Sequence, residues 1–306
     1  MKIHKMRKIL PITLFAGSLL TACGEQPDKN FGSQFIGEVV PGESPQVDAP
    51  SEKPRFRWEF SEANIQHDYS YFQRLEVETR MHSFADDDMS QMKQEAVAQG
   101  RLSIKSQGDH SADLELRDVS MQMTVHWGDD ESMEDEHSFP PVSLTGMKED
   151  GSAPFAESAQ TLFLQLLFPL PPGELAEGES VVIPQEMPFR VDNILVDIKG
   201  ESEITLSRYV QNQDRLCAEL LVSTDISWMN SEKEQQNSAS LRGKSIFLFD
   251  VHNQVFVEGT LAMLMEIETN MGHRSGAGSD KDENLPRDRM TSDNLITLRL
   301  LDSESD

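Results

Sequence analysis

Two cysteines carry the most distinctive side-chain chemistry in this sequence of 306 residues. Cys23 follows Leu20-Thr21-Ala22 at the end of a short apolar run, and Cys217 lies at the start of an alternating, strand-like run. A thiolate can act as a nucleophile, bind zinc or enter a disulfide, but a zinc site built from several cysteines needs more than two. The surroundings of each cysteine therefore decide which chemistry is open to it.

The first 22 residues have the organisation of a secretory signal peptide. Basic residues precede an apolar run from Ile9 to Leu20, and small residues follow it before Cys23. This run has about 12 residues and contains Pro11, whereas a transmembrane helix needs about 20. We therefore expect residues 1–22 to be a signal peptide rather than a permanent span.

The segment Leu20-Thr21-Ala22-Cys23 resembles the lipobox of bacterial lipoproteins, in which an aliphatic residue and two small residues precede a cysteine. The resemblance implies cleavage before Cys23, diacylglycerol on its sulfur and acylation of the new amino terminus. Several acyl chains hold a protein on a membrane far better than one. The resemblance also implies a location in the bacterial cell envelope. Gly24, rather than Asp, after the lipidated residue resembles outer-membrane sorting in Gram-negative envelopes. Cys217 is then left without an intramolecular partner, and we expect it to be a half-buried structural residue.

No catalytic motif is recognisable in the rest of the chain. The sequence lacks Gly-x-Ser-x-Gly, a Gly-rich phosphate loop, Ser-x-x-Lys and His-Glu-x-x-His. Histidines such as His126 and His252 stand at positions that favour solvation, and no pair has helical metal-ligand spacing. Carboxylate pairs for glycoside hydrolysis depend on a separation that the sequence does not contain. We therefore predict no catalytic residue, no cofactor and no metal.

The chain is strongly acidic. Its formal charge is −26, and removing residues 1–22, which hold four basic residues and no acidic one, makes it −30. Such a charge repels polyanions, so nucleic acid is not an expected partner. The acidic runs Asp86-Asp87-Asp88 and 129–136 lack the glycine and ligand spacing of a calcium loop, and we expect both to be solvated loops.

Composition divides the mature chain into two parts. Residues 23–54 are rich in Gly, Pro, Ser, Gln and acidic residues, which predicts a lipidated terminus and flexible tether. Its one apolar cluster, Phe31–Val40, is a segment able to dock on the folded body. Residues 55–306 then form an acidic, β-rich body.

Period-two alternation runs through most of that body. Tyr71, Leu75 and Val77 share one face of a strand, for example, while charged residues occupy the other. Between 111 and 127 the alternation changes phase, which predicts a bulge near Arg117 and Asp118. We place hairpin turns at Gly200 and at 252–254. We expect an antiparallel sheet of about eight to ten strands with one solvent-exposed face.

One segment follows helical spacing instead. The run "SAPFAESAQTLFLQLLFPLPP" begins with Pro154 in a permitted first turn and ends at Pro169, predicting an amphipathic helix over 155–168. The fold class is therefore mainly β with one helix, α+β. Whether the sheet is curved stays open, as does a duplication into packed halves 55–150 and 175–306, which two alternating runs ending in Trp127 and Trp228 suggest.

A curved sheet closed by this helix would enclose an apolar pocket, an arrangement that resembles lipoprotein-sorting chaperones. Methionine is flexible and suits an adaptable pocket. The candidate pocket residues are Met121, Met123, Leu162, Phe163, Leu166, Met263 and Met265. The body also resembles uncharacterised β-rich bacterial lipoproteins, through Leu167–Pro172, Gly178-Glu179 and Gly243, and those families have no assigned biochemistry.

Two classes of function follow. The first is a non-catalytic binding or interaction module, anchored to the membrane through acyl chains on Cys23 and open to an envelope protein as partner. The alternative is a carrier of lipid or another apolar ligand, held between curved sheet and helix. A hydrolase is a third and less favoured class, because no catalytic motif supports it.

Overall fold

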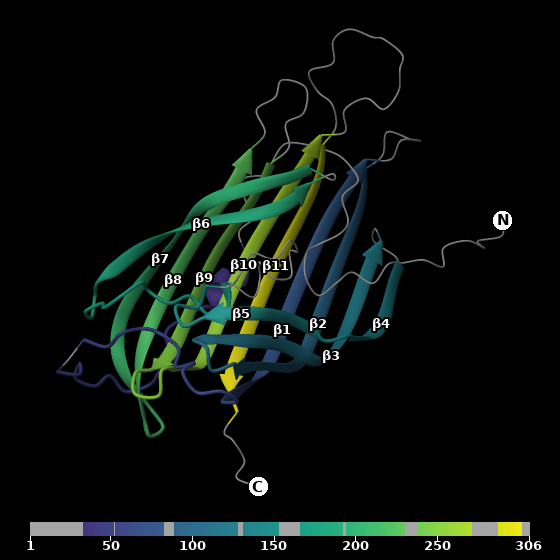
Figure 1. Cartoon of the computed structure of the whole chain (residues 1–306). Coiled ribbons are helices and arrows are strands. Elements are labelled where there is room, and N and C mark those ends of the chain that lie inside the picture. Colours follow the sequence, from purple (N-terminus) through teal and green to yellow (C-terminus); the bar gives the residue numbers. More distant parts are fainter. Residues whose placement is uncertain are drawn as a thin grey trace.

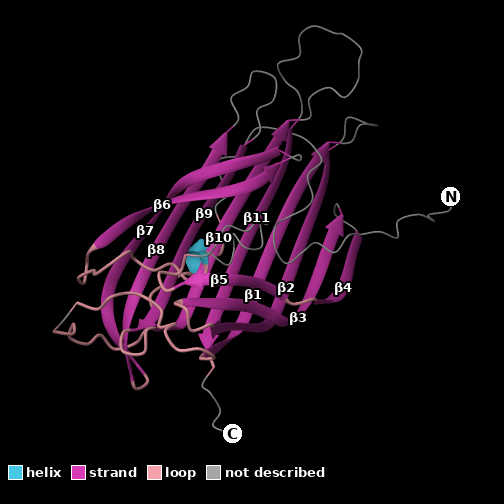
Figure 2. Ribbon diagram, in the orientation of Figure 1, coloured by secondary structure: helices cyan, strands magenta, loops and turns pink. Residues whose placement is uncertain are grey.

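In the computed structural model, residues 33–51, 53–82, 89–127, 131–152, 166–191, 194–229, 238–270 and 287–301 are described. They form one antiparallel sheet of eleven strands (Figures 1 and 2). The strands are β1 (Gln66–His82), β2 (Met89–Ser106), β3 (Ser111–Trp127), β4 (Glu131–Phe139), β5 (Val142–Lys148), β6 (Ser180–Val191), β7 (Ile194–Asn212), β8 (Arg215–Met229), β9 (Ser238–Asp250), β10 (Val255–Asn270) and β11 (Arg287–Leu300). The prediction of a mainly antiparallel β protein is confirmed, with more strands than expected.

The strand order places the first and the last strand of the chain side by side. The order across the sheet is β4-β3-β2-β1-β11-β10-β9-β8-β7-β6, and β5 pairs with β3 off this path. Two meanders, β1–β4 and β6–β11, therefore meet where the first strand pairs with the last. The two blocks of sequence share one continuous sheet, which curves so that β6 and β7 run across the direction of the central strands in Figure 1.

The predicted bulge in β3 is confirmed. Gln99 pairs with Ser120 and Arg101 with Arg117, so two residues of β3 oppose one residue of β2. Asp118 takes a positive φ of 55° there. The bulge divides β3 into two parts, one paired with β5 and the other with β4.

Two turn and loop predictions are wrong. Gly200 lies inside β7, opposite Ile226 of β8, and not in a turn. A Cβ at Gly200 would lie 2.1 Å from the carbonyl oxygen of Asp225, so glycine allows a close approach of two strands. The acidic run expected as a loop forms strand β4 over Glu131–Phe139, because a mostly exposed strand at the edge of a sheet needs no continuous apolar face. The turn at 252–254 is confirmed.

The predicted helix over 155–168 is not supported. No helix of seven or more residues occurs in the described part of the chain, where the helical residues are the 3-10 turn η1 (Ile36–Glu38) and Leu166. Residues 153–165 lie outside the described residues, and so do Asp86-Asp87-Asp88. At the end of the predicted helix, Leu166, Leu167 and Phe168 are buried in the main core.

The strand alternation separates two faces of the sheet. One face, which we call the inner face, carries Tyr71, Phe247 and Leu298 and belongs to the main hydrophobic core. The opposite, outer face carries Ile246 and Leu295 in a separate small cluster. Because side chains alternate along every strand, the register of pairing decides which residues become neighbours on each face.

Candidate binding site on the inner face of the sheet

Three rows of side chains cross the middle of the inner face. The register places each residue beside its partner on the next strand, and we call these three lines the central rows. From β3 toward β7 they are Val125, Gln94, Val77, Ser292, Met265, Leu241 and Ile226; Met123, Ala96, Leu75, Asn294, Met263, Gly243, Thr224 and Ser202; and Met121, Ala98, Gln73, Ile296, Leu261, Ser245, Val222 and Ile204. Small, polar and methionine side chains make up much of this surface.

The central rows contain all four methionines of the predicted pocket. Met121, Met123 and Met263 are buried, and Met265 is half-buried against the same core that includes Leu166. Strands β2, β1 and β11 separate the two methionine pairs, which puts them about 19 Å apart at the usual strand spacing. The structure therefore brings these methionines to one face but not to one point. Leu162 and Phe163 lie outside the described residues.

A chain of buried hydrogen bonds crosses from β1 to β11 within and beside the central rows. The Tyr71 hydroxyl donates to Gln73 Oε1 at 2.9 Å, and Gln73 Nε2 donates to Asn294 Oδ1 at 2.9 Å. Asn294 Nδ2 then donates to Ser292 Oγ at 2.9 Å. Burial raises the pKa of the Tyr71 hydroxyl, so this group stays protonated and remains a donor. Gln73 is 2% exposed and Ser292 1% exposed, so the chain satisfies polar groups inside the core.

Gln94 is the polar residue of the central rows that stays incompletely paired. Its side chain is 5% exposed, and its Oε1 accepts no hydrogen bond from any described residue. Its Nε2 donates weakly to the Met92 sulfur, 3.5 Å away. A buried acceptor without a donor costs about 1–3 kcal/mol. Sequence analysis missed this residue, although a glutamine on the apolar side of an alternating strand was a signal.

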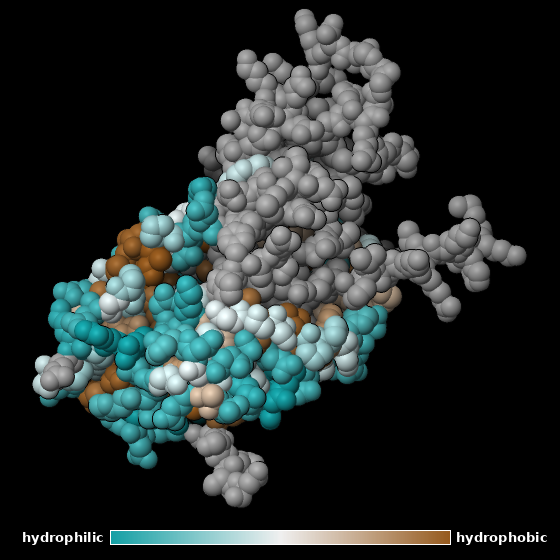
Figure 3. Space-filling model, in the orientation of Figure 1, coloured by the Kyte–Doolittle hydropathy of each residue, from teal (hydrophilic) through white to brown (hydrophobic). Residues whose placement is uncertain are grey.

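The central rows contain no ionisable side chain. Charged residues on the same strands lie on the outer face, where Lys93 Nζ is 3.3 Å from a carboxylate oxygen of Glu76. The described surface visible in Figure 3 is largely hydrophilic, in keeping with the acidic composition. Charge is thus kept on the outside, and the middle of the inner face offers hydrogen bonds without charge.

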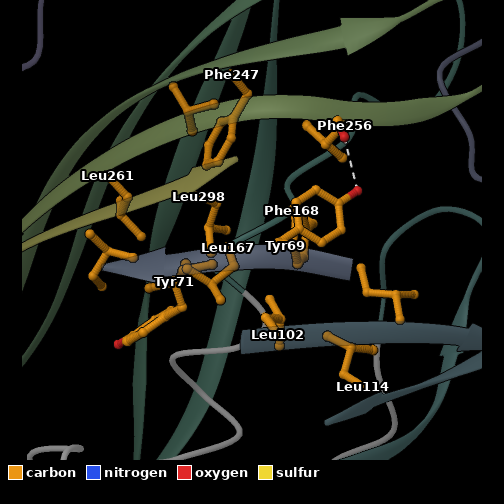
Figure 4. Packing of buried hydrophobic residues seen from close by; sticks show 14 of the residues in the cluster. Tyr69, Tyr71, Leu102, Leu114, Leu167, Phe168, Phe247, Phe256, Leu261 and Leu298 are labelled. Atoms are coloured by element: carbon orange, nitrogen blue, oxygen red, sulfur yellow. Dashed lines mark hydrogen bonds between the residues drawn. The ribbon is translucent and has the colours of Figure 1, made fainter. Parts of the chain in front are cut away.

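Aromatic side chains pack together on the inner face at one end of the strands. The Trp58 ring is fully buried, and its centroid lies 5.5 Å from those of Phe60 and Phe168 and 5.4 Å from that of Phe256. The Tyr69 hydroxyl donates to the carbonyl oxygen of Phe256 at 2.9 Å, the dashed line in Figure 4. We call this group of five the aromatic end. Its side chains interlock closely, which leaves the central rows as the candidate binding surface.

The outer face holds part of the segment expected to be a tether. Phe35 and Val39 are buried against Ile246, Ala262 and Leu295, and the Arg74 guanidinium lies 4.8 Å from the Phe35 ring centroid. The segment continues along β7, where Gln46 bridges to Val210 and the Arg208 side chain donates to the Gly42 carbonyl at 2.8 Å. Residues 33–47 therefore lie against the sheet.

Asp293 binds the start of that segment through hydrogen bonds. Its carboxylate accepts hydrogen bonds from Ser33 Oγ at 2.6 Å and from the Gln34 backbone N–H at 2.9 Å. Burial raises the pKa of the Asp293 carboxyl, and these hydrogen bonds only partly oppose the rise. The docked segment thus buries a carboxylate.

The remaining residues with candidate chemistry are dispersed. Cys23 lies outside the described residues. Cys217 is fully rather than half-buried, beside Val210 and Val257, and burial raises the pKa of its thiol to about 12. His126 is half-buried and His252 is exposed in its turn.

Two features are absent from the described residues. These residues contain no group of three His, Cys, Asp or Glu side chains arranged to hold a metal ion. No helix within the described ranges is both long and apolar enough to cross a membrane.

No protein-family model matches the chain, and no curated protein matches it. The central rows combine burial, small side chains, flexible methionines and uncharged polar groups.

Proposed function

We propose that this protein is a lipid-anchored, non-catalytic binding protein of the bacterial cell envelope, and that it carries an apolar ligand against the central rows. The observation that carries this proposal is the make-up of those rows. Ala96, Ala98 and Gly243 project little or no side chain from the sheet, and the neighbouring methionines can change rotamer to follow a ligand's shape. Such a surface accommodates an acyl chain.

The balance of polar and apolar groups supports the same proposal. Ligand sites for small molecules are mostly apolar, with a few placed polar groups that orient the ligand. The central rows have this composition, with Gln73, Gln94 and Asn294 among apolar neighbours. They offer no pair of ionisable groups for acid and base catalysis, so binding is the activity that this surface supports best.

The docked segment limits how far the body stands from its proposed anchor. Residues 24–32 separate Cys23 from the first docked residue, Ser33. Nine extended residues reach at most about 32 Å. In this proposal the body therefore works close to the membrane surface, where lipids are available as ligands.

Extraction of the full chain from a bacterial envelope in mild detergent tests the proposal. Lipids released from the purified protein by organic solvent are identified by mass spectrometry, and the Cys23→Ala chain is the control that separates bound lipid from covalent acyl chains. We expect a lipid that accompanies both chains. A protein that carries no lipid and binds no acyl-chain probe would contradict the proposal.

A further inference from the structure

Gln94, Asn294 and Ser292 lie together on a part of the inner face where each has unused hydrogen-bonding capacity. The amide of Asn294 carries two N–H donors, and the chain of hydrogen bonds uses one of them. Ser292 Oγ accepts that bond, and no described residue accepts the hydroxyl proton of Ser292. Gln94 Oε1 adds an acceptor without a donor. These three residues therefore offer donors and an acceptor to one further polar group.

Their positions fit a small polar group rather than an extended one. Gln94, Val77 and Ser292 follow one another in a central row, so the Cα atoms of Gln94 and Ser292 are about 10 Å apart at the usual strand spacing. Asn294 is the residue of β11 that shares the face with Ser292, two positions along. A ligand end that carries a hydroxyl and a carbonyl offers a donor to Gln94 Oε1 and an acceptor to Asn294 and Ser292.

The described residues of the central rows offer no charge that would bind an anion. The central rows have no cationic side chain, and Arg74 and Lys93 belong to the outer face of the same strands. A buried anion without a cation is strongly unfavourable, whereas an uncharged donor and acceptor completes the existing hydrogen bonds.

From these three observations we propose that the ligand is an acyl chain with an uncharged polar end, such as a glyceride hydroxyl and ester, and that Gln94, Ser292 and Asn294 bind this end. The inference rests on the proposed function and adds its ligand class. The Gln94 amide receives a ligand hydroxyl at Oε1, while Asn294 Nδ2 and the Ser292 hydroxyl donate to the ligand carbonyl. The acyl chain lies along the neighbouring methionine, alanine and glycine positions.

Competition binding to the intact, delipidated protein tests this proposal. A fluorescent acyl probe is displaced by a monoacylglycerol, by the free fatty acid or by the matched lysophosphatidic acid, all with the same acyl chain, at pH 8. We expect the monoacylglycerol to bind at least about tenfold more tightly than either anion, which corresponds to one good hydrogen-bonding contact. Equal affinities, or a preference for an anion, would overturn the inference and leave the proposed function standing. Failure of every acyl probe would overturn both.

Gln94→Leu separates the residue's role in binding from a role in folding. Removing a buried, unpaired acceptor does not weaken the core, so the variant should unfold at the same temperature or higher. We expect its affinity for the monoacylglycerol to fall about tenfold, to that of the fatty acid. Gln122→Leu, on an exposed position of β3, is the matched control and should keep the preference. A Gln94→Leu protein that keeps it would overturn the assignment of Gln94.

Discussion

The aromatic end and the central rows occupy the same face of one sheet and are packed in opposite ways. At the aromatic end, large rings such as Trp58 and Phe256 interlock, with a ring-centroid distance of 5.4 Å. In the central rows, small residues, methionines and polar side chains stand among aliphatic ones. Close packing of rigid rings favours stability, whereas small and flexible side chains favour adaptation to a ligand.

This difference indicates that the two regions of the inner face have different roles, stability at the aromatic end and ligand binding in the central rows. Residues at one end stabilise the sheet, so residues in the middle are free to be less well packed. Proteins commonly give up some stability at functional sites and recover it elsewhere. Substitutions at the aromatic end should therefore cost more stability than substitutions in the central rows.

The largest effect is expected from Trp58→Ala at the aromatic end. Removing a fully buried indole should lower the free energy of unfolding by about 4 kcal/mol, and so lower Tm by about 10 °C for a body of this size. Thermal unfolding followed by circular dichroism measures the change. Met263→Leu in the central rows should cost less than about 1.5 kcal/mol. Similar losses for both variants would remove the contrast between the two regions.

A matched pair of glycine substitutions sharpens the comparison. A Cβ at Gly259 would lie 2.2 Å from a carbon of the Phe247 ring, whereas one at Gly243 meets nothing closer than 3.5 Å. Gly259→Ala should therefore destabilise by about 1–3 kcal/mol through overpacking, and Gly243→Ala should be neutral or slightly stabilising. Urea unfolding of the two variants measures this difference. The reverse order would show that the central rows are the more tightly packed region.

A smaller, pH-dependent effect is expected at Asp293, on the outer face. Burial raises the pKa of its carboxyl above 3.8, so the docked form binds the proton more tightly than the undocked form. Docking of residues 33–40 should therefore become more stable as the pH falls through the raised pKa toward 3.8. Hydrogen exchange of these amides, corrected for intrinsic rates, measures it. Asp293→Asn should lack this dependence, and a docked segment that loosens on acidification would contradict the prediction.

The smallest effect is expected at Cys217. With a thiol pKa of about 12, only about one molecule in ten thousand carries a thiolate there at pH 8. The folded protein should therefore show no measurable maleimide labelling of Cys217, and unfolding in urea should restore it. Trp58→Ala should accelerate labelling more than Met263→Leu does, if the aromatic end stabilises the whole sheet. Rapid labelling of the folded wild-type protein would contradict this.

Local sequence patterns were sufficient for most of the strands and for the bulge in β3. Hydrophobic residues that change phase between Leu116 and Val119 require an extra residue, whatever the partner strand is. Gly200 was misassigned because a glycine in a turn and a glycine beneath a neighbouring backbone have the same sequence signature. The edge strand β4 was missed because hydrophobic alternation detects only strands with a buried face.

The candidate site was only partly predictable for a different reason. The methionines were recognisable as inward-facing, because alternation assigns each residue to a face. Their neighbours were not, since Gln73 and Asn294 are 221 residues apart and meet only because β1 pairs with β11. Nothing local to either strand encodes that pairing.

Alternation in the chain was thus enough to establish antiparallel strands, their inward-facing residues and the kink in β3, because these depend on neighbours within a few positions. The pairing of the first strand with the last, the docking of residues 33–47 and the chain of hydrogen bonds from Tyr71 to Ser292 were decided by the assembled sheet. Each of these joins segments far apart in sequence, and the register that aligns them is determined only when one face of all the strands is buried together.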